Sequence, residues 1–132
     1  MSIKLLYLII VFLFSFVAKC YSQQDDRWIY YGKSDDGKGE YYYDKESIVH
    51  IQDTASVWLK YIAIKDDFNE FEEKYIDKIL WRMDLVCERR IYAIRETKYY
   101  YKDGSSTSTY SKSFQSILPE NILENVYKSV CK

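Results

Sequence analysis

The 132-residue chain has 19 basic and 20 acidic residues, which gives a formal charge of −1, and 18% of its residues are aromatic. This length supports one hydrophobic core and therefore one domain. The near-neutral charge excludes the strongly basic composition typical of nucleic-acid-binding domains, so no nucleic-acid partner is expected.

The N-terminal segment has the pattern of a secretion signal. Lys4 precedes an apolar run from Leu5 to Val17, which is too short for a membrane-spanning helix but fits a signal-peptide core. We expect residues 1–22 to be a signal peptide, with cleavage near Cys20 to Ser22, and residues 23–132 to be one mature domain. The alternative is lipidation of Cys20, which would give a lipid anchor in the outer membrane; the charged Lys19 before it argues against this.

Short aromatic and β-branched segments separated by turn signals predict strands in the first half of the mature chain. The expected strands span residues 28–31, 40–44, 48–51 and 55–65. A turn cluster at residues 33–39 makes the first two a hairpin, and a turn or short helical piece is expected at residues 44–48. The strand at residues 55–65 is placed centrally in the sheet because both of its faces are mostly apolar.

Residues 66–78 fit two different structures. Phe68, Phe71 and Tyr75 fall at helical spacing, and acidic residues at the front would suit a helix N-terminus. Six acidic residues against Lys74 alone also suit an ordered acidic loop. Both alternatives stand at this point.

The segment from Ile79 to Cys87 alternates apolar and mixed residues with a period of two, which predicts a strand with one apolar face. We expect a bend near residues 88–90, because one strand reaching Tyr101 would be far longer than ordinary strands. A tight turn at residues 102–105 and a serine- and threonine-rich edge strand at residues 107–114 follow.

Pro119 is expected to open a C-terminal helix. The apolar stripe of this helix consists of Ile122, Leu123, Val126 and Val130. Outside the leader, the only cysteines are Cys87, on the apolar side of its strand, and Cys131. An oxidised pair would therefore hold the end of the helix against the apolar face of the sheet.

Several classes of catalytic and metal site lack the residues they need. His50 is the single histidine, so it has no partner for a multi-histidine metal site, and the four glycines form no phosphate-binding loop. Adjacent acids such as Asp66 and Asp67 are typical of a solvated surface. We expect no catalysis, no metal and no cofactor.

A basic and aromatic strip is the candidate binding surface. If the strand register continues through the expected bend, one side opposite the helix reads Arg90, Tyr92, Ile94, Glu96, Lys98, Tyr100. Arginine and aromatic side chains are enriched in protein interfaces, so Arg90, Tyr92, Lys98 and Tyr100 are the candidate partner-binding residues. The alternatives are an ordinary exposed face or a homodimer surface, and a bulge near Glu88 would exchange the two faces.

An ordered set of segments resembles the surface-adhesin protein E family of bacterial secreted proteins. These segments are Tyr41 to Ile48, Val57-Trp58, Asp84 to Cys87, Tyr101 to Gly104, Leu118-Pro119 and Cys131. The resemblance implies an antiparallel sheet with one packed helix and a Cys87–Cys131 disulfide. It also implies, from the best-known members, a lipid-anchored outer-membrane protein that binds host extracellular-matrix and plasma proteins.

We therefore expect an α+β fold, with an antiparallel sheet of about five or six strands, a C-terminal helix packed on one face and one disulfide. The expected function is a non-enzymatic binding module of the cell envelope, secreted across the inner membrane to the periplasm or the outer-membrane surface. One alternative is a periplasmic structural or assembly protein with an envelope protein as partner. Another is a small secreted inhibitor of an envelope-attacking enzyme such as lysozyme.

Overall fold

The computed structural model describes residues 2–5, 9–10 and 26–132. The expected cleavage site and Cys20 lie outside these residues, as does most of the expected signal peptide. None of the helices in the described ranges has the length and apolar character needed to cross a membrane.

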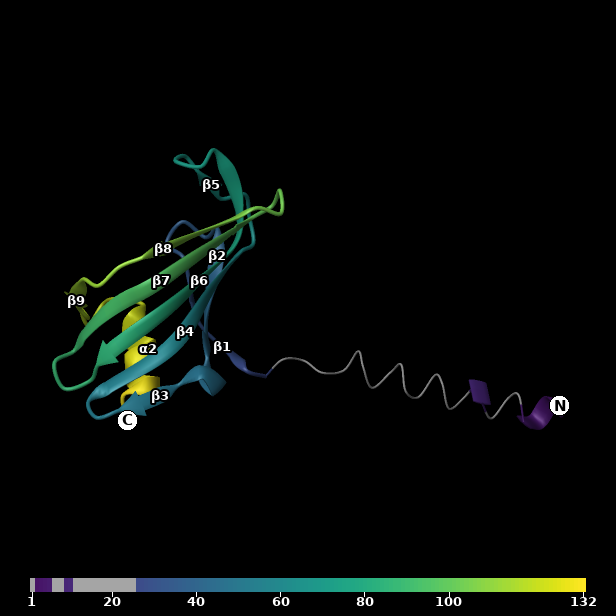
Figure 1. Ribbon diagram of the computed structural model, residues 1–132, viewed down its shortest axis with the longest axis horizontal. Helices are drawn as coiled ribbons and strands as arrows, with labels where there is room; N and C mark the ends of the chain where they lie inside the picture. Colours follow the sequence, from purple (N-terminus) through teal and green to yellow (C-terminus); the bar gives the residue numbers. More distant parts are fainter. Residues whose placement is uncertain (1, 6–8, 11–25) are drawn as a thin grey trace.

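Within residues 26–132 the chain forms nine strands, one short 3-10 helix and one α-helix (Figure 1). The strands are β1 (Trp28–Lys33), β2 (Gly39–Asp44), β3 (Val49–Ile51), β4 (Thr54–Ala63), β5 (Phe68–Asn69), β6 (Lys74–Val86), β7 (Ile91–Tyr101), β8 (Ser106–Tyr110) and β9 (Phe114–Ser116). The helices are η1 (Lys45–Ser47) and α2 (Leu123–Val130). The predicted strands of the first half and the short helical piece are confirmed to within two residues at each end.

The strands form one antiparallel sheet whose main path runs β1-β2-β4-β6-β7-β8. The three short strands β3, β5 and β9 pair with β4, β6 and β7. The predicted count of five or six strands is too low, because segments of two or three residues are too short to show an alternating pattern. The central position predicted for β4 is confirmed, since it pairs with β2 and β3 on one side and β6 on the other.

Helix α2 packs on one face of the sheet (Figure 1). Its buried residues Leu123, Val126 and Val130 join the same core as the strand residues Met83 and Leu85, which are fully buried. Burial of alternate residues on β6 confirms the predicted apolar face. The side of the sheet away from α2 is called the outer face below.

A disulfide between Cys87 and Cys131 joins the end of β6 to the end of α2, with the two Cα atoms 5.5 Å apart. The predicted pairing is therefore confirmed. This bond fixes the C-terminal end of the helix against the apolar face of the sheet.

The predicted bend at residues 88–90 is wrong, because the chain reverses there. Residues 87–90 form a turn, and β7 returns antiparallel to β6 with Val86 opposite Ile91. Arg90 adopts a left-handed conformation, with φ of 50°, which permits the tight reversal. Pairing the two long strands satisfies the backbone hydrogen bonds of both.

Neither structure predicted for residues 66–78 is correct. Strand β5 pairs with the start of β6, with Phe68 opposite Tyr75, and a turn at residues 70–73 joins them. The side chain of Asn69 accepts hydrogen bonds from the backbone N–H groups of Phe71 and Glu72. The aromatic residues that match a helical spacing therefore belong to a β-hairpin.

Two boundaries near the C-terminus also differ from prediction. The strand expected at residues 107–114 is divided into β8 and β9, and β8 lies at the edge of the sheet as predicted. The helix begins at Leu123, because Pro119 and Glu120 form a turn and the Asn121 side chain accepts a hydrogen bond from the Leu123 N–H.

Candidate partner-binding surfaces

A β-bulge in β7 divides the predicted strip between the two faces of the sheet. Ile94 lies opposite Met83 and Glu96 lies opposite Arg82, so Arg95 is an extra residue without a partner on β6. Directly opposed residues of an antiparallel pair point to the same face. Ile94 therefore points toward α2 with the buried Met83, whereas Glu96 points outward with Arg82.

Arg90 and Tyr92 lie on the helix side. The Arg90 guanidinium is ion-paired with Glu124 of α2 and lies 4.4 Å from the ring centroid of Tyr127. Tyr92 is opposite the buried Leu85. Arg90 therefore contacts the helix directly and Tyr92 packs against the core, so the strip predicted as continuous is divided between the two faces.

Lys98 and Tyr100 lie together on the outer face. The Lys98 ammonium is 3.4 Å from the Glu96 carboxylate and 5.9 Å from the ring centroid of Trp58. The ring of Tyr100 is 4.9 Å from the ammonium of Lys78. Two of the four candidate residues therefore belong to one surface. Trp58 and Lys78 belong to the same surface through their contacts with these two residues.

The surface continues across β4 to β2 and β1 through residues that the sequence reasoning did not single out. The Lys60 ammonium lies 4.1 Å from the Trp28 ring centroid and 5.5 Å from that of Tyr42. We call this surface the cation–aromatic patch. It consists of Trp28, Tyr42, Trp58, Lys60, Lys78, Lys98 and Tyr100.

A signal for part of this patch is present in the sequence. Trp58 and Lys60 alternate with the buried Val57 and Leu59, so the period of two in β4 assigns them to the outer face. No comparable signal identifies Trp28, because its neighbours show no clear alternation.

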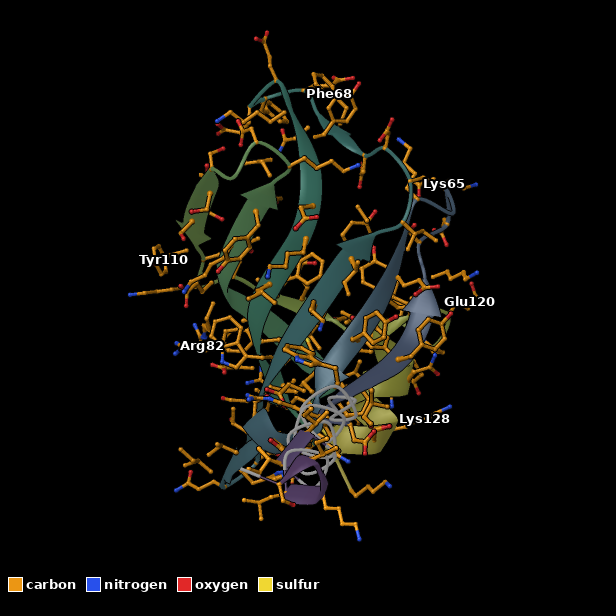
Figure 2. The ribbon with its side chains drawn as sticks, turned by 90° about the vertical axis from the view of Figure 1, so that its right-hand side faces the viewer. Lys65, Phe68, Arg82, Tyr110, Glu120 and Lys128 are labelled. Atoms are coloured by element: carbon orange, nitrogen blue, oxygen red, sulfur yellow. A yellow bond between two sulfur atoms is a disulfide. The ribbon has the colours of Figure 1, made fainter. Side chains whose placement is uncertain are left out.

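The lower part of the outer face carries an ordered polar network. Asp84 accepts hydrogen bonds from Ser56, at 2.6 Å, and from Arg95, at 2.7 Å. Partial burial raises the pKa of Asp84, but these two hydrogen bonds together with the positive charges of Arg95 and Arg82 outweigh it and hold the pKa below its ordinary value. In Figure 2, Arg82 and Tyr110 lie on the left of the view, whereas Glu120, which precedes α2, and Lys128, which belongs to α2, lie on the right.

The described residues contain no group of three or more His, Cys, Asp or Glu side chains that could hold a metal ion. His50 is exposed on β3, where it lies opposite Ala55 of β4.

The family comparison agrees with the resemblance that the sequence segments showed. The family model described as surface-adhesin protein E matches residues 28–132. No match was found among the curated proteins.

Several solved structures of Haemophilus influenzae protein E are similar in fold. Crystal form II is 17% identical with a TM-score of 0.60, over 83% of this chain and 91% of that chain. The selenomethionine form is 16% identical with a TM-score of 0.59, over 83% and 89%. Protein E from non-typeable Haemophilus influenzae is 18% identical with a TM-score of 0.57, over 83% and 78%. At these identities the likeness shows a shared fold.

Proposed function

The chain belongs to the surface-adhesin protein E family, and from this premise we propose that it is a non-enzymatic adhesin that binds protein partners through the cation–aromatic patch. In this proposal residues 23–132 form one domain that is secreted across the inner membrane and displayed at the cell surface. Its partners are host extracellular-matrix or plasma proteins.

The single observation that carries the proposal is the row of lysine–aromatic pairs across the sheet. Lys60, Lys78 and Lys98 each lie within 6 Å of an aromatic ring, and the pairs cross β1, β2, β4, β6 and β7. Aromatic side chains supply a large contact area at low entropic cost, and a cation held over a ring is already ordered before a partner arrives. This combination supports a prepared interface.

The charge of the patch favours an acidic partner surface. Lys60, Lys78 and Lys98 provide its positive charge, Glu96 forms an ion pair with Lys98, and Glu40 accepts a hydrogen bond from the Tyr42 hydroxyl. The chain as a whole is slightly acidic, so the patch is a local concentration of positive charge. Association with an acidic surface would then be faster at low salt.

Protease treatment of intact cells tests the surface location. The domain should disappear from cells whose periplasmic control protein survives. Purified residues 23–132 should then bind members of a panel of immobilised matrix and plasma proteins, with weaker binding at higher salt. Protection of the domain until the outer membrane is opened would contradict the adhesin assignment and favour a periplasmic role.

A further inference from the structure

A groove lies on the helix side of the sheet, between the β1–β2 turn and the residues that lead into α2. Its volume is about 620 Å³, and its apolar lining is Tyr41, Leu118, Pro119 and Ile122. Its charged lining residues are Asp35 and Glu120, which are acidic, and Lys33, which is basic. It is separate from the cation–aromatic patch, which is on the other face of the sheet.

The floor of the groove is a fixed aromatic surface. The Tyr41 ring is stacked on Tyr31 at a centroid distance of 5.7 Å. It also meets the rings of Tyr61 and Trp81 at 5.3 and 6.1 Å. A ring held by three aromatic neighbours offers a flat apolar face that does not need to be ordered when a ligand binds.

The β1–β2 wall is fixed by hydrogen bonds. The Ser34 hydroxyl donates to Asp36 Oδ1, at 2.7 Å, and accepts from the Gly39 N–H, at 3.0 Å. Asp36 Oδ1 also accepts from the Lys38 N–H. This wall is therefore formed before any ligand arrives.

The opposite wall is equally fixed. The Asn121 side chain accepts from the Leu123 N–H, at 3.0 Å, and the Asn121 N–H donates to the Leu118 carbonyl, at 2.9 Å. Ile122 reaches so close to β1 that a Cβ at Gly32 would overlap its side chain. Leu118 remains 62% exposed at the rim, although its backbone is held in place.

Acidic groups surround the floor. Burial raises the pKa of Tyr41, and the negative charges of Asp36, Asp35 and Asp67 raise it further. The charge lining the groove consists of Asp35 and Glu120 against Lys33. A ligand that complements this groove therefore needs an apolar group next to a positive charge.

We propose that the groove binds a basic segment of a partner polypeptide, with an apolar or aromatic side chain on Tyr41 and an adjacent lysine or arginine at Asp35 and Glu120. The proposal does not depend on the cation–aromatic patch, because that patch requires an acidic partner surface. The two surfaces would select opposite charges on opposite faces.

The proposal is tested with three probe molecules, each of which carries one indole ring. These are the tripeptide amides acetyl-Lys-Trp-Lys and acetyl-Glu-Trp-Glu, and tryptamine. Titration of the ¹⁵N-labelled domain, followed by amide chemical shifts, should move the signals of Gly32, Leu118 and Asn121 with the lysine peptide. The glutamate peptide should bind at least fivefold more weakly. Equal binding of the two peptides, or shifts confined to the outer face, would overturn the proposal.

The third probe separates a peptide site from a small-amine site. Tryptamine carries the indole and one positive charge but no peptide backbone, so it should bind more weakly than the lysine peptide. If it binds as tightly as the lysine peptide, the assignment to a polypeptide segment is wrong.

Variants locate the binding. Leu118→Ser should weaken binding of the lysine peptide at least threefold, and Asp35→Asn with Glu120→Gln should remove the preference for lysine over glutamate. Ile51→Ser is the matched control, because Ile51 is 70% exposed and lies on β3, away from the groove. Leu118 is an exposed side chain, so an unchanged melting temperature will show that Leu118→Ser is folded. Equal loss of lysine-peptide binding in Leu118→Ser and Ile51→Ser would contradict the proposed site.

Discussion

The Arg95 guanidinium donates to the Asp84 carboxylate at 2.7 Å, and this pair lies at the bulge that divides β7. On one side of the bulge, Tyr92 and Ile94 point toward α2. On the other side, Lys98 and Tyr100 point outward. The extra residue Arg95 thus decides which side chains of β7 are available to a partner.

The Asp84 network predicts a specific acid dependence of stability. Because folding lowers the pKa of Asp84, its charged form adds stability above the pKa of the unfolded state, and this contribution is lost as the pH falls through the folded value. Asp84→Asn should be less stable than the wild type at pH 7. The difference should shrink as the pH falls below about 4. Urea unfolding at pH 7 and pH 3 measures both differences, and a constant difference would contradict this account.

The disulfide should contribute strongly to stability. Cys87 and Cys131 are separated by 44 residues, and closing a loop of this length contributes roughly 4 kcal/mol in the chain-entropy model. Cys87→Ser with Cys131→Ser should lower the free energy of unfolding by an amount of this order. The free energy of unfolding of the wild type in a reducing agent provides the matching measurement. If this free energy falls by less than about 1 kcal/mol in both experiments, helix packing alone holds the C-terminus.

Gly39 is required by the ring that crosses it. A Cβ at this buried position would overlap the ring of Tyr61, whose hydroxyl donates to Asp67 at 2.7 Å. Gly39→Ala should therefore destabilise the domain by about 1–3 kcal/mol. In a protein that already carries Tyr61→Leu, the Gly39→Ala change should cost less, because the ring that the added Cβ would overlap is absent. Thermal unfolding of the four proteins tests this coupling, and strictly additive effects would argue against the overlap.

Arg90 should matter for stability and not for adhesion. Its guanidinium is ion-paired with Glu124, whose side chain is only 12% exposed. Arg90→Ala would leave this carboxylate with only the more distant Lys128 ammonium, at 3.8 Å, as its ion-pair partner, at a cost of about 1–2 kcal/mol. The melting temperature should fall while binding of matrix or plasma proteins by the folded variant stays unchanged. Weaker binding at an unchanged melting temperature would place Arg90 in the interface instead.

Much of the fold follows from patterns that are local in the sequence. The period of two in β6 predicts its buried face, the apolar character of both faces of β4 predicts its central position, and the spacing of Leu123, Val126 and Val130 predicts the buried face of α2. Reversal at residues 87–90 is harder to foresee, because the turn uses Arg90 in a left-handed conformation where glycine would be the usual signal. The segment from Phe68 to Tyr75 misleads for a related reason, since its aromatic spacing fits a helix while Asn69 fixes a turn.

The candidate site was only half predictable. The chemistry of the surface, lysine with aromatic rings, is evident from Lys98 and Tyr100. The position of this surface is not evident from the sequence. A single extra residue, Arg95, exchanges the faces of β7, and no feature of the composition indicates that bulge. The lysine–aromatic pairs across β1, β2 and β4 depend on which distant segments pair with one another. The sequence of a single strand does not determine that pairing.

The most direct test of the proposed function reverses the charge of the cation–aromatic patch. Lys78→Glu with Lys98→Glu should weaken binding of the domain to its matrix or plasma partner at least tenfold, because both lysines face the partner from the outer face. Lys45→Glu with Lys65→Glu makes the same change in net charge at exposed positions outside the patch and should bind as the wild type does. Both variants should melt within a few degrees of the wild type. Equal binding by the two variants would contradict the assignment of the patch as the adhesive surface.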